Sequence, residues 1–272
     1  MVPNVAGSSP VDRPSIMTPF EAIILGIIQG VTEFLPISSS GHLELGQYWL
    51  GLTEMHQFIL FNLMCHLGTL CAIVFFFFSR IRDVDRKTCL QVVVGTLPLF
   101  PLVLIMKPIK AIYGQPQYLG YCFLVTAGLL YASDRWIFFK REKHSWKEAA
   151  WVGIFQAVAI LPGISRSGAT ISAGKFLGWP ASQAVTFSFL LAIPAILGGI
   201  FIEMLQLFTQ YDYEAGNVGI VQYFLGFVVS LIIGYYALKW MMKFAEKNHF
   251  GIFVWYCLFL GIASILYFNV YE

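Results

Sequence analysis

Several polar residues interrupt an otherwise apolar stretch near the start of the chain, GIIQGVTEFLPISSSGH at positions 26–42. Carboxylates, hydroxyls and imidazoles are the groups that serve as general bases, nucleophiles and metal ligands. Gln29 and Glu33 are four positions apart, so a helix would place both on one face, and Pro36 would end that helix. The candidates of this first cluster are Gln29, Glu33, Ser38, Ser39, Ser40 and His42.

A second cluster has the same layout but different side chains, LPGISRSGAT at positions 161–170. Its candidates are Ser165, Arg166, Ser167 and Thr170. In both clusters a serine precedes a glycine, a pattern that suits the start of a helix, whose free backbone N–H groups attract anions. The first cluster therefore offers acid and base chemistry, and the second offers a clamp for a phosphate-type anion.

The elements that carry these clusters belong to a membrane protein. Of the 272 residues, 58% are hydrophobic and 12% are charged, whereas soluble domains carry about 25% charged residues. Six spans approach the roughly 20 apolar residues that cross a bilayer as a helix. They are 58–78, 90–106, 118–138, 183–208, 218–243 and 251–269. The composition predicts an all-α polytopic membrane protein, and the net charge of +2 gives no indication of a nucleic-acid partner.

Charged residues at such a depth are costly, which makes Glu33 and Arg166 informative. An arginine or a carboxylate at mid-membrane costs roughly 2.5–3.5 kcal/mol on insertion scales. A purely structural ion pair between the two would stabilise the fold too little to offset that cost. We therefore expect Glu33 and Arg166 to form a site that binds an ion. The serines are less decisive, because Ser38, Ser165 and Ser167 are as consistent with close helix packing as with ligand binding.

The two clusters belong to an internal repeat. A shift of 127 positions places EAIILGIIQGVTEFLPISSSGH (21–42) on EAAWVGIFQAVAILPGISRSGA (148–169) without a gap. Self-similarity of this kind indicates two copies of one structural unit. The predicted units are a polar N-terminal tail at 1–16, a first repeat at 17–138 and a second repeat at 139–272.

Each copy begins with two short apolar runs separated by a proline and a Ser/Gly-rich turn, at 20–52 and at 148–179. Each run alone is too short to cross a bilayer, so we expect a re-entrant helix pair with an unwound turn at mid-depth. A single kinked helix followed by a surface loop is the alternative. Three spans follow each pair, and this odd number makes the two repeats inverted, with their turns meeting near the midplane.

The expected ligand is a lipid phosphate. Two helix starts and Arg166 favour a phosphate group, with serine hydroxyls as further donors. A diphosphate carries more negative charge than one arginine and one histidine offset. A divalent cation between Glu33 and the phosphate oxygens would supply the remainder. The surroundings are lipid, which points to a phosphate carried by a lipid.

Other polar residues are expected to lie outside this chemistry. Asn62 and His66, four apart in a span, are predicted to form an interhelical hydrogen-bonding face rather than ligands. Lys175 lies late in the second short helix and is expected to reach the membrane surface. Glu44 either joins the site or faces the lipid headgroups.

The motifs at 29–42 and 162–170 resemble the two signature motifs of the bacterial undecaprenyl-diphosphatases of the bacitracin-resistance type. The resemblance covers essentially the whole chain from Met17, including SFLLAIP at 188–194. It implies a multi-pass phosphatase of the bacterial inner membrane that depends on a divalent metal cation, Mg or Ca. Such an enzyme removes the terminal phosphate of undecaprenyl diphosphate, and the monophosphate returns as the carrier for cell-wall synthesis.

The resemblance also implies residue roles. Glu33 would be the metal-associated or general-base carboxylate, and Gln29 its helical neighbour. Ser39 and His42 match positions near the reacting phosphorus, and Arg166 matches the phosphate clamp. Supporting donors would be Ser38, Ser40, Ser165, Ser167 and Thr170. The nucleophile stays open between Ser39, His42 and a metal-activated water.

Two other functions compete with the phosphatase. A polyprenyl-phosphate transporter or flippase would use the same inverted repeats but would need no nucleophile. An intramembrane serine protease could use Ser39 and His42, but it would not need Arg166 and would tolerate EDTA. The partners expected in any case are the lipid substrate and membrane lipids, and a homodimer is left open.

The loops divide into two sets of unequal charge. One face is predicted to carry both termini and the loops 51–57, 107–117 and 209–217, and the other the loops 79–89, 139–147 and 239–250. The second face holds eleven Lys and Arg residues against three on the first. By the positive-inside rule, the face with eleven positive residues is cytoplasmic, and both termini lie outside. The resemblance then predicts an outward-opening site, because the carrier diphosphate is released at the outer leaflet.

Overall fold

The computed structural model describes residues 17–52, 55–104, 116–136, 145–209 and 218–271, and the predicted tail at 1–16 lies outside them. Every regular element in these ranges is helical. The α-helices are α1 (Pro19–Thr32), α2 (Ser39–Trp49), α3 (Ile59–Phe76), α4 (Phe78–Arg82), α5 (Arg86–Thr96), α6 (Phe100–Leu104), α8 (Leu119–Arg135), α9 (Trp146–Val158), α10 (Arg166–Phe176), α11 (Ala181–Thr209), α12 (Ile220–Glu246) and α13 (Gly251–Tyr271). Short 3-10 helices are η2 (Met55–Phe58), η3 (Leu97–Leu99) and η4 (Pro116–Tyr118).

Helices α1 and α9 both begin with a capping box. Thr18 caps α1, and the Glu21 carboxylate accepts the Thr18 backbone N–H at 2.7 Å while Thr18 Oγ1 accepts the Glu21 N–H at 3.3 Å. Ser145 and Glu148 form the equivalent capping box at the start of α9. Reciprocal bonds of this type satisfy two of the free N–H groups at a helix start.

The second helix of each hairpin begins at a serine cap. Ser38 Oγ accepts the N–H of Gly41 at 3.4 Å, and Ser165 Oγ accepts that of Gly168 at 3.0 Å. Helices α2 and α10 therefore begin at residues 39 and 166, at the Ser-Gly sequences whose pattern predicts a helix start.

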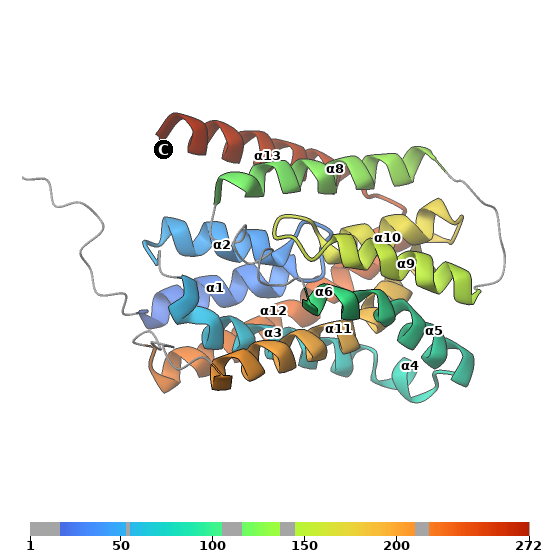
Figure 1. Cartoon of the computed structure of the whole chain (residues 1–272), viewed down its shortest axis with the longest axis horizontal. Helices are drawn as coiled ribbons and strands as arrows, with labels where there is room; N and C mark the ends of the chain where they lie inside the picture. Colours follow the sequence, from blue (N-terminus) through green and yellow to red (C-terminus); the bar gives the residue numbers. More distant parts are fainter. Residues whose placement is uncertain (1–16, 53–54, 105–115, 137–144, 210–217, 272) are drawn as a thin grey trace, which may run out of the picture.

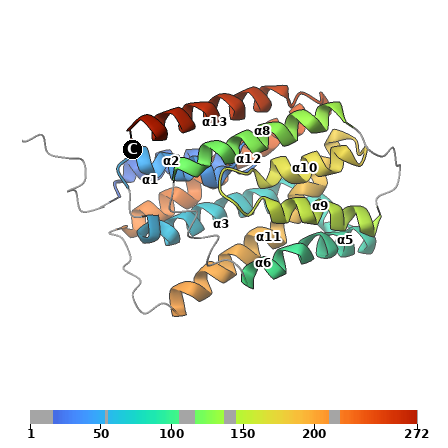
Figure 2. The same cartoon turned by 45° about the horizontal axis from the view of Figure 1, so that its top comes forward.

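The two helical hairpins lie in opposite halves of the molecule. Figures 1 and 2 show α1 and α2 side by side in one half, α9 and α10 in the other, and the connecting turns near the centre. The turns contact each other closely, because a Cβ added at Gly41 would lie 3.0 Å from Gly163 Cα. Gly163 has a φ of +85°, a conformation that glycine adopts without steric cost.

Longer helices surround the hairpins. Four of them are long and apolar enough to cross a membrane, Ile59–Phe76, Ala181–Leu205, Ile220–Lys247 and Gly251–Val270, and these correspond to four of the six predicted spans. Helix α12 packs along α1 and α3, and α13 packs along α8. Small residues allow these close approaches: a Cβ at Gly68 would lie 2.3 Å from the Phe227 carbonyl oxygen.

The two remaining spans differ from the prediction. Helix α8 has 17 residues and covers most of the span expected at 118–138. The span expected at 90–106 is not one helix, since α5 ends at Thr96, η3 contains Pro98, and α6 contains Pro101. Proline lacks the N–H that continues a helix and clashes with the preceding turn, which explains the interruption.

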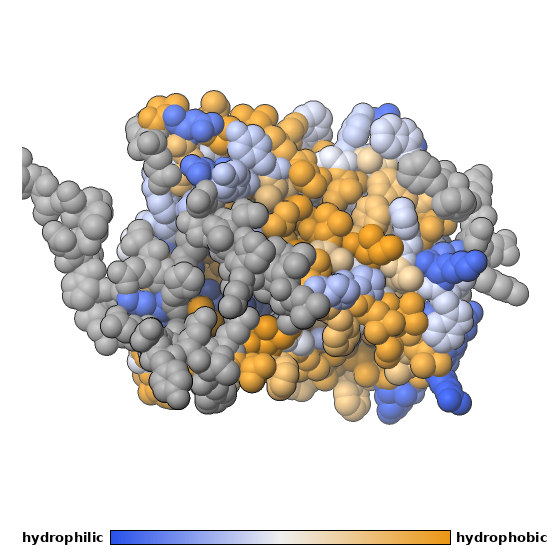
Figure 3. All heavy atoms as spheres, viewed as in Figure 1, coloured by the Kyte–Doolittle hydropathy of each residue, from blue (hydrophilic) through white to orange (hydrophobic). Residues whose placement is uncertain are grey.

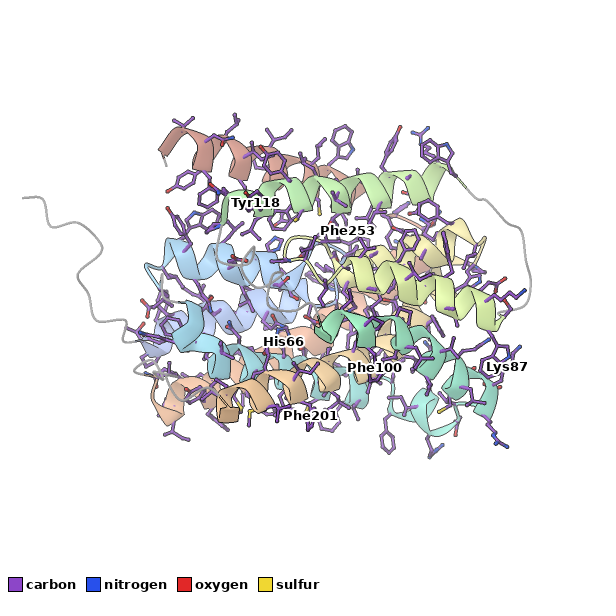
Figure 4. All side chains as sticks on the ribbon, viewed as in Figure 1. His66, Lys87, Phe100, Tyr118, Phe201 and Phe253 are labelled. Carbon is purple, nitrogen blue, oxygen red and sulfur yellow. The ribbon has the colours of Figure 1, made fainter. Side chains whose placement is uncertain are left out.

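The surface pattern fits a molecule whose long axis crosses a bilayer. Figure 3 shows apolar residues over the middle of the visible face and hydrophilic residues toward its ends. Large apolar side chains such as Phe201, 68% exposed, lie on this surface. Figure 4 places Lys87 at the end of the molecule that carries α4 and the start of α5. A water-soluble protein would bury such apolar side chains, so the exposed ones face lipid.

Candidate active site

A cavity of about 50 Å³ lies where the two turns meet. It is lined by Thr32, Glu33, Ser38, Ser39, Ser40, Ala159, Ile164, Ser165, Arg166 and Ser167. A single water needs roughly 10–15 Å³, so the cavity has room for a group larger than one water molecule. A second cavity of about 490 Å³, among α4, α5, α11 and α12, contains none of the predicted site residues.

Glu33 is the centre of the hydrogen-bond network in the first cavity. It caps the C-terminus of α1 and is only 6% exposed. Its Oε1 accepts a bond from Arg166 Nη2 at 2.5 Å, and its Oε2 accepts from Ser39 Oγ at 2.6 Å and from Gln29 Nε2 at 3.0 Å. Glu33 and Arg166 thus form the ion pair that the sequence argument judged the less favourable arrangement.

Arg166 is the first residue of α10 and points across to the first hairpin. Only one of its terminal nitrogens is used in this pair. Nη1 is buried and has no hydrogen-bond partner among the described residues. A buried charged donor left without an acceptor is costly, and a ligand oxygen in the cavity would satisfy it.

Gln29 connects Glu33 to α3. Its Nε2 lies 2.9 Å from His66 Nδ1 as well as 3.0 Å from Glu33 Oε2, and His66 Nδ1 is 3.7 Å from the same carboxylate oxygen. The side chain of Asn62 accepts a bond from Gln47 Nε2 at 2.9 Å. The predicted interhelical bonding by Asn62 and His66 is therefore confirmed. What the prediction missed is the proximity of His66 to Glu33, near the centre of the molecule (Figure 4).

The serines of the two turns divide into two groups. Ser39 donates to Glu33, and Ser40 is exposed at the cavity. Ser38, Ser165 and Ser167 line the cavity and also hold the turns together. Ser38 Oγ accepts the Gly163 N–H at 3.1 Å, and Ser167 Oγ donates to the Leu35 carbonyl at 3.2 Å.

Thr126 and Tyr256, two residues absent from the predicted set, fix the turns from outside. Thr126 Oγ1 on α8 accepts the Ser165 N–H at 3.0 Å and donates to the Gly163 carbonyl at 2.9 Å. The Tyr256 hydroxyl on α13 lies 2.8 Å from His42 Nε2. Both residues lie on long helices far from the motifs in sequence, and nothing in their sequence context indicates the contact.

The structure does not bring His42 and Thr170 into the cavity. His42 Nδ1 is 2.6 Å from the Ser38 carbonyl oxygen, and its ring stacks on Tyr256 with centroids 5.6 Å apart. Thr170 Oγ1 lies 2.6 Å from Ser188 Oγ and 2.9 Å from the Arg166 carbonyl oxygen. Both side chains therefore form hydrogen bonds beside the cavity, and neither of them lines it.

Two charged residues near the hairpins occupy other places. Glu44 is 6% exposed and does not line the cavity, so it neither joins this site nor faces the headgroups. Lys175 was expected to reach the membrane surface, but the structure buries it. Its Nζ forms an ion pair with Asp134 and lies 4.3 Å from the centre of the Phe250 ring. Helices α8, α9 and α11 pack against α10, and the Phe250 ring lies beside the ammonium group, which leaves Lys175 no route to the surface.

The oxygen donors around Glu33 suit a cation only when a phosphate is also present. Within the described residues no group of three His, Cys, Asp or Glu side chains could hold a metal ion. Gln29 Oε1 is buried with no partner in the part of the chain that the structure describes, and it adds one oxygen donor to the Glu33 carboxylate. Magnesium is commonly held by one or two carboxylates together with substrate phosphates, and this donor set fits that arrangement.

Comparison with known proteins gives consistent matches along the chain. The profile of the family described as bacitracin resistance protein BacA matches residues 22–263. An undecaprenyl-diphosphatase of Protochlamydia amoebophila is 52% identical over 93% of this chain and 100% of its own length. Proteins with the same name from Desulfosudis oleivorans and Methanobrevibacter smithii are 37% and 35% identical, over 92% and 90% of this chain and 98% and 96% of their own lengths.

Proposed function

We propose the function of this chain from the premise that it belongs to the family of bacitracin resistance protein BacA. It is an enzyme, an undecaprenyl-diphosphatase, which hydrolyses undecaprenyl diphosphate to undecaprenyl phosphate and inorganic phosphate. The polyprenyl monophosphate is thereby recycled as a carrier for cell-wall synthesis. The near-complete coverage of relatives with this name supports the assignment.

The protein is a multi-pass membrane protein. We place it in the bacterial inner membrane with both termini outside, and we propose that α1–α2 and α9–α10 are re-entrant pairs of two inverted repeats. Unwound backbone at mid-depth is tolerated only when it is buried in protein or lines a cavity. The two turns meet both conditions, since they bond to each other and line the cavity.

One contact carries the proposed chemistry: Ser39 Oγ donates to Glu33 Oε2 at 2.6 Å. A nucleophile within hydrogen-bond reach of a base is the usual arrangement for covalent catalysis. In the first step Ser39 Oγ attacks the terminal phosphorus and its proton passes to Glu33. The bond from oxygen to phosphorus forms as the anhydride bond breaks and undecaprenyl phosphate leaves. Water then hydrolyses the phosphoserine, which yields inorganic phosphate and restores the hydroxyl.

Arg166 supports this reaction as the phosphate clamp. Its Nη1 is buried with no partner among the described residues, and its Nη2 can move from Glu33 to a phosphate oxygen. An arginine binds a phosphate through paired donors, and it stabilises the charge that develops in the transition state. Ser165 and Ser167, whose hydroxyl oxygens lie 3.1 Å apart at the start of α10, line the cavity beside it.

A divalent cation, Mg or Ca, completes the charge balance in this proposal. Glu33 and the amide oxygen of Gln29 would hold it together with the phosphate oxygens of the substrate. When bound it would neutralise part of the negative charge of the diphosphate. The residues of the chain keep their own tasks: Glu33 takes the proton, Ser39 forms the ester and Arg166 holds the phosphate.

The competing transporter function needs no bond between a serine and a carboxylate. The deciding experiment uses detergent-purified protein, farnesyl diphosphate as a short-chain prenyl diphosphate, and release of inorganic phosphate with and without EDTA. We expect metal-dependent release from the parent and release slower by at least about 10²-fold from Ser39→Ala. Substrate labelled in its terminal phosphate should leave acid-stable label on the parent protein only. Absence of release with any divalent cation would favour transport, and EDTA-resistant release would contradict the proposed cation.

A further inference from the structure

Ser38 has an unusual backbone conformation at the edge of the cavity. Its φ is +74° and its ψ is 100°, and within the described residues the only other non-glycine residue with positive φ is Asn248. A serine is strained in this region, and such strain persists only where neighbouring groups hold it in place. Ser38 immediately precedes Ser39, so its backbone decides where the Ser39 hydroxyl lies.

His42 holds this strained residue. The Ser38 carbonyl oxygen is 2.6 Å from His42 Nδ1 and 3.3 Å from the His42 backbone nitrogen. One carbonyl thus accepts two bonds from a residue one helical turn further on. The Ser38 side chain is held from the other side, where its Oγ accepts the Gly163 N–H at 3.1 Å.

The bond to Ser38 also decides which imidazole nitrogen carries the proton. A carbonyl oxygen only accepts, so His42 Nδ1 must be the donor. In the neutral ring Nε2 is then an acceptor, and the Tyr256 hydroxyl at 2.8 Å donates to it. Stacking on Tyr256, with 11° between the ring planes, and an edge contact with Phe123 fix the ring orientation.

We propose that His42 and Tyr256 are positioning residues that act through the Ser38 backbone. His42 holds Ser38 in its left-handed conformation, which sets Ser39 Oγ against Glu33, and Tyr256 holds the imidazole in the tautomer that donates from Nδ1. Both ring nitrogens of His42 are engaged in this task, and the ring lies outside the cavity lining. The proposal rests on the phosphatase function described above and gives His42 no role in proton transfer to the substrate.

Two substitutions of His42 separate positioning from proton transfer. The amide nitrogen of asparagine is as many bonds from Cα as Nδ1 is, so His42→Asn can keep the donor to Ser38. Glutamine places its amide nitrogen at the position of Nε2 instead. We expect His42→Asn to retain turnover to within about tenfold, and His42→Gln to lose about 10²-fold, the scale of a nucleophile misplaced by about 1 Å. Equal, severe losses in both variants would overturn the proposal.

The pH profile gives a second readout. If His42 only positions Ser38, kcat should depend on pH in the same way in the parent and in His42→Asn, and only the maximum rate should differ. If the rise or the fall of kcat with pH seen in the parent were missing in His42→Asn, His42 would titrate in the reaction, and the proposal would be wrong. A parent without phosphatase activity would instead contradict the proposed function, so the two failures are distinct.

The tautomer can be measured without any turnover. In protein with 15N-labelled histidine, the His42 signal is identified by its loss in His42→Asn, and we expect the form protonated at Nδ1. Tyr256→Phe removes the hydroxyl and should reduce both the population of this tautomer and kcat, with Tyr267→Phe on the same helix as the control. A Tyr256→Phe protein with unchanged tautomer and rate would remove Tyr256 from the proposal, and a parent protonated at Nε2 alone would overturn the whole of it.

Discussion

Arg166 Nη2 lies 2.5 Å from Glu33 Oε1, although 133 positions separate the two residues in the chain. One comes from the end of α1 and the other from the start of α10, so each hairpin supplies one charge. The cavity therefore lies where the two hairpins meet. This explains why neither motif alone contains both the carboxylate and the arginine of the site.

Replacing Glu33 by Gln should abolish most of the turnover in phosphate release. Glutamine keeps the shape of the side chain but cannot take a proton from Ser39, and general-base effects are typically about 10²–10⁴-fold. Glu44→Gln is the matched control, because Glu44 is another buried carboxylate that does not line the cavity. Size-exclusion profiles should show that both variants fold. Retention of more than about a tenth of the parent rate by Glu33→Gln would contradict the assigned role.

Arg166→Lys keeps the positive charge but loses the planar pair of donors. Lysine is a compact point charge and cannot bond Glu33 and a phosphate through two fixed nitrogens at once. We expect a higher KM and a lower kcat, measured by phosphate release at varied substrate concentration. If the lysine variant matched the parent in both constants, bidentate clamping would be the wrong description of this residue.

Ser39 and Ser40 are neighbours with different expected roles. Ser39 Oγ is bonded to Glu33, whereas Ser40 is exposed and its Oγ lies 3.4 Å from Ser38 Oγ. Ser39→Ala should remove at least about 10²-fold of kcat, the scale of a lost acid–base contribution, and Ser40→Ala should stay within a few-fold of the parent. Equal rates for the two alanine variants would argue for water as the nucleophile.

The buried pair of Lys175 and Asp134 should matter for stability rather than for catalysis. It joins α10 to α8 and lies against the Phe250 ring, away from the cavity. Asp134→Asn leaves the lysine charge buried without its partner, which typically costs about 3–5 kcal/mol. Arg82→Ala, which breaks an exposed pair with Asp83, is the control and should cost less than about 1 kcal/mol. Thermal unfolding in detergent measures both, and equal midpoints would contradict the structural role.

The sequence was most informative where chemistry and periodicity coincide. Glu33 and Arg166 were predicted from the cost of charged groups in an apolar segment and Ser39 from its place in the first polar cluster, and the structure places all three in one cavity. The four longest helices were predicted from apolar length alone. Both predictions depend on local properties of the chain, which a single sequence contains.

What the sequence could not provide are contacts between distant segments. The bond from Tyr256 to His42 joins residues 214 positions apart, and the clamp of Thr126 on the second turn joins α8 to residues near 165. Lys175 was predicted to reach the surface because its place near a helix end says nothing about Asp134 on α8 and Phe250, which contact it. The interrupted span at 90–106 was the exception, since Pro98 and Pro101 were visible in the sequence.

The last prediction concerns the side from which substrate reaches the cavity. The predicted cytoplasmic face carries Lys247, and the opposite face carries the C-terminus near Asn269, both of them exposed in the structure. Ser40 is exposed at the cavity, so a cysteine there reports its access. In a background without the five native cysteines, we expect Ser40→Cys and Asn269→Cys to react with a membrane-impermeant thiol reagent in intact cells. Lys247→Cys should react only in inverted vesicles. External prenyl diphosphate should protect Ser40→Cys but not Asn269→Cys, because only the cavity binds the diphosphate. Labelling of Ser40→Cys confined to inverted vesicles would mean that the cavity opens to the cytoplasm.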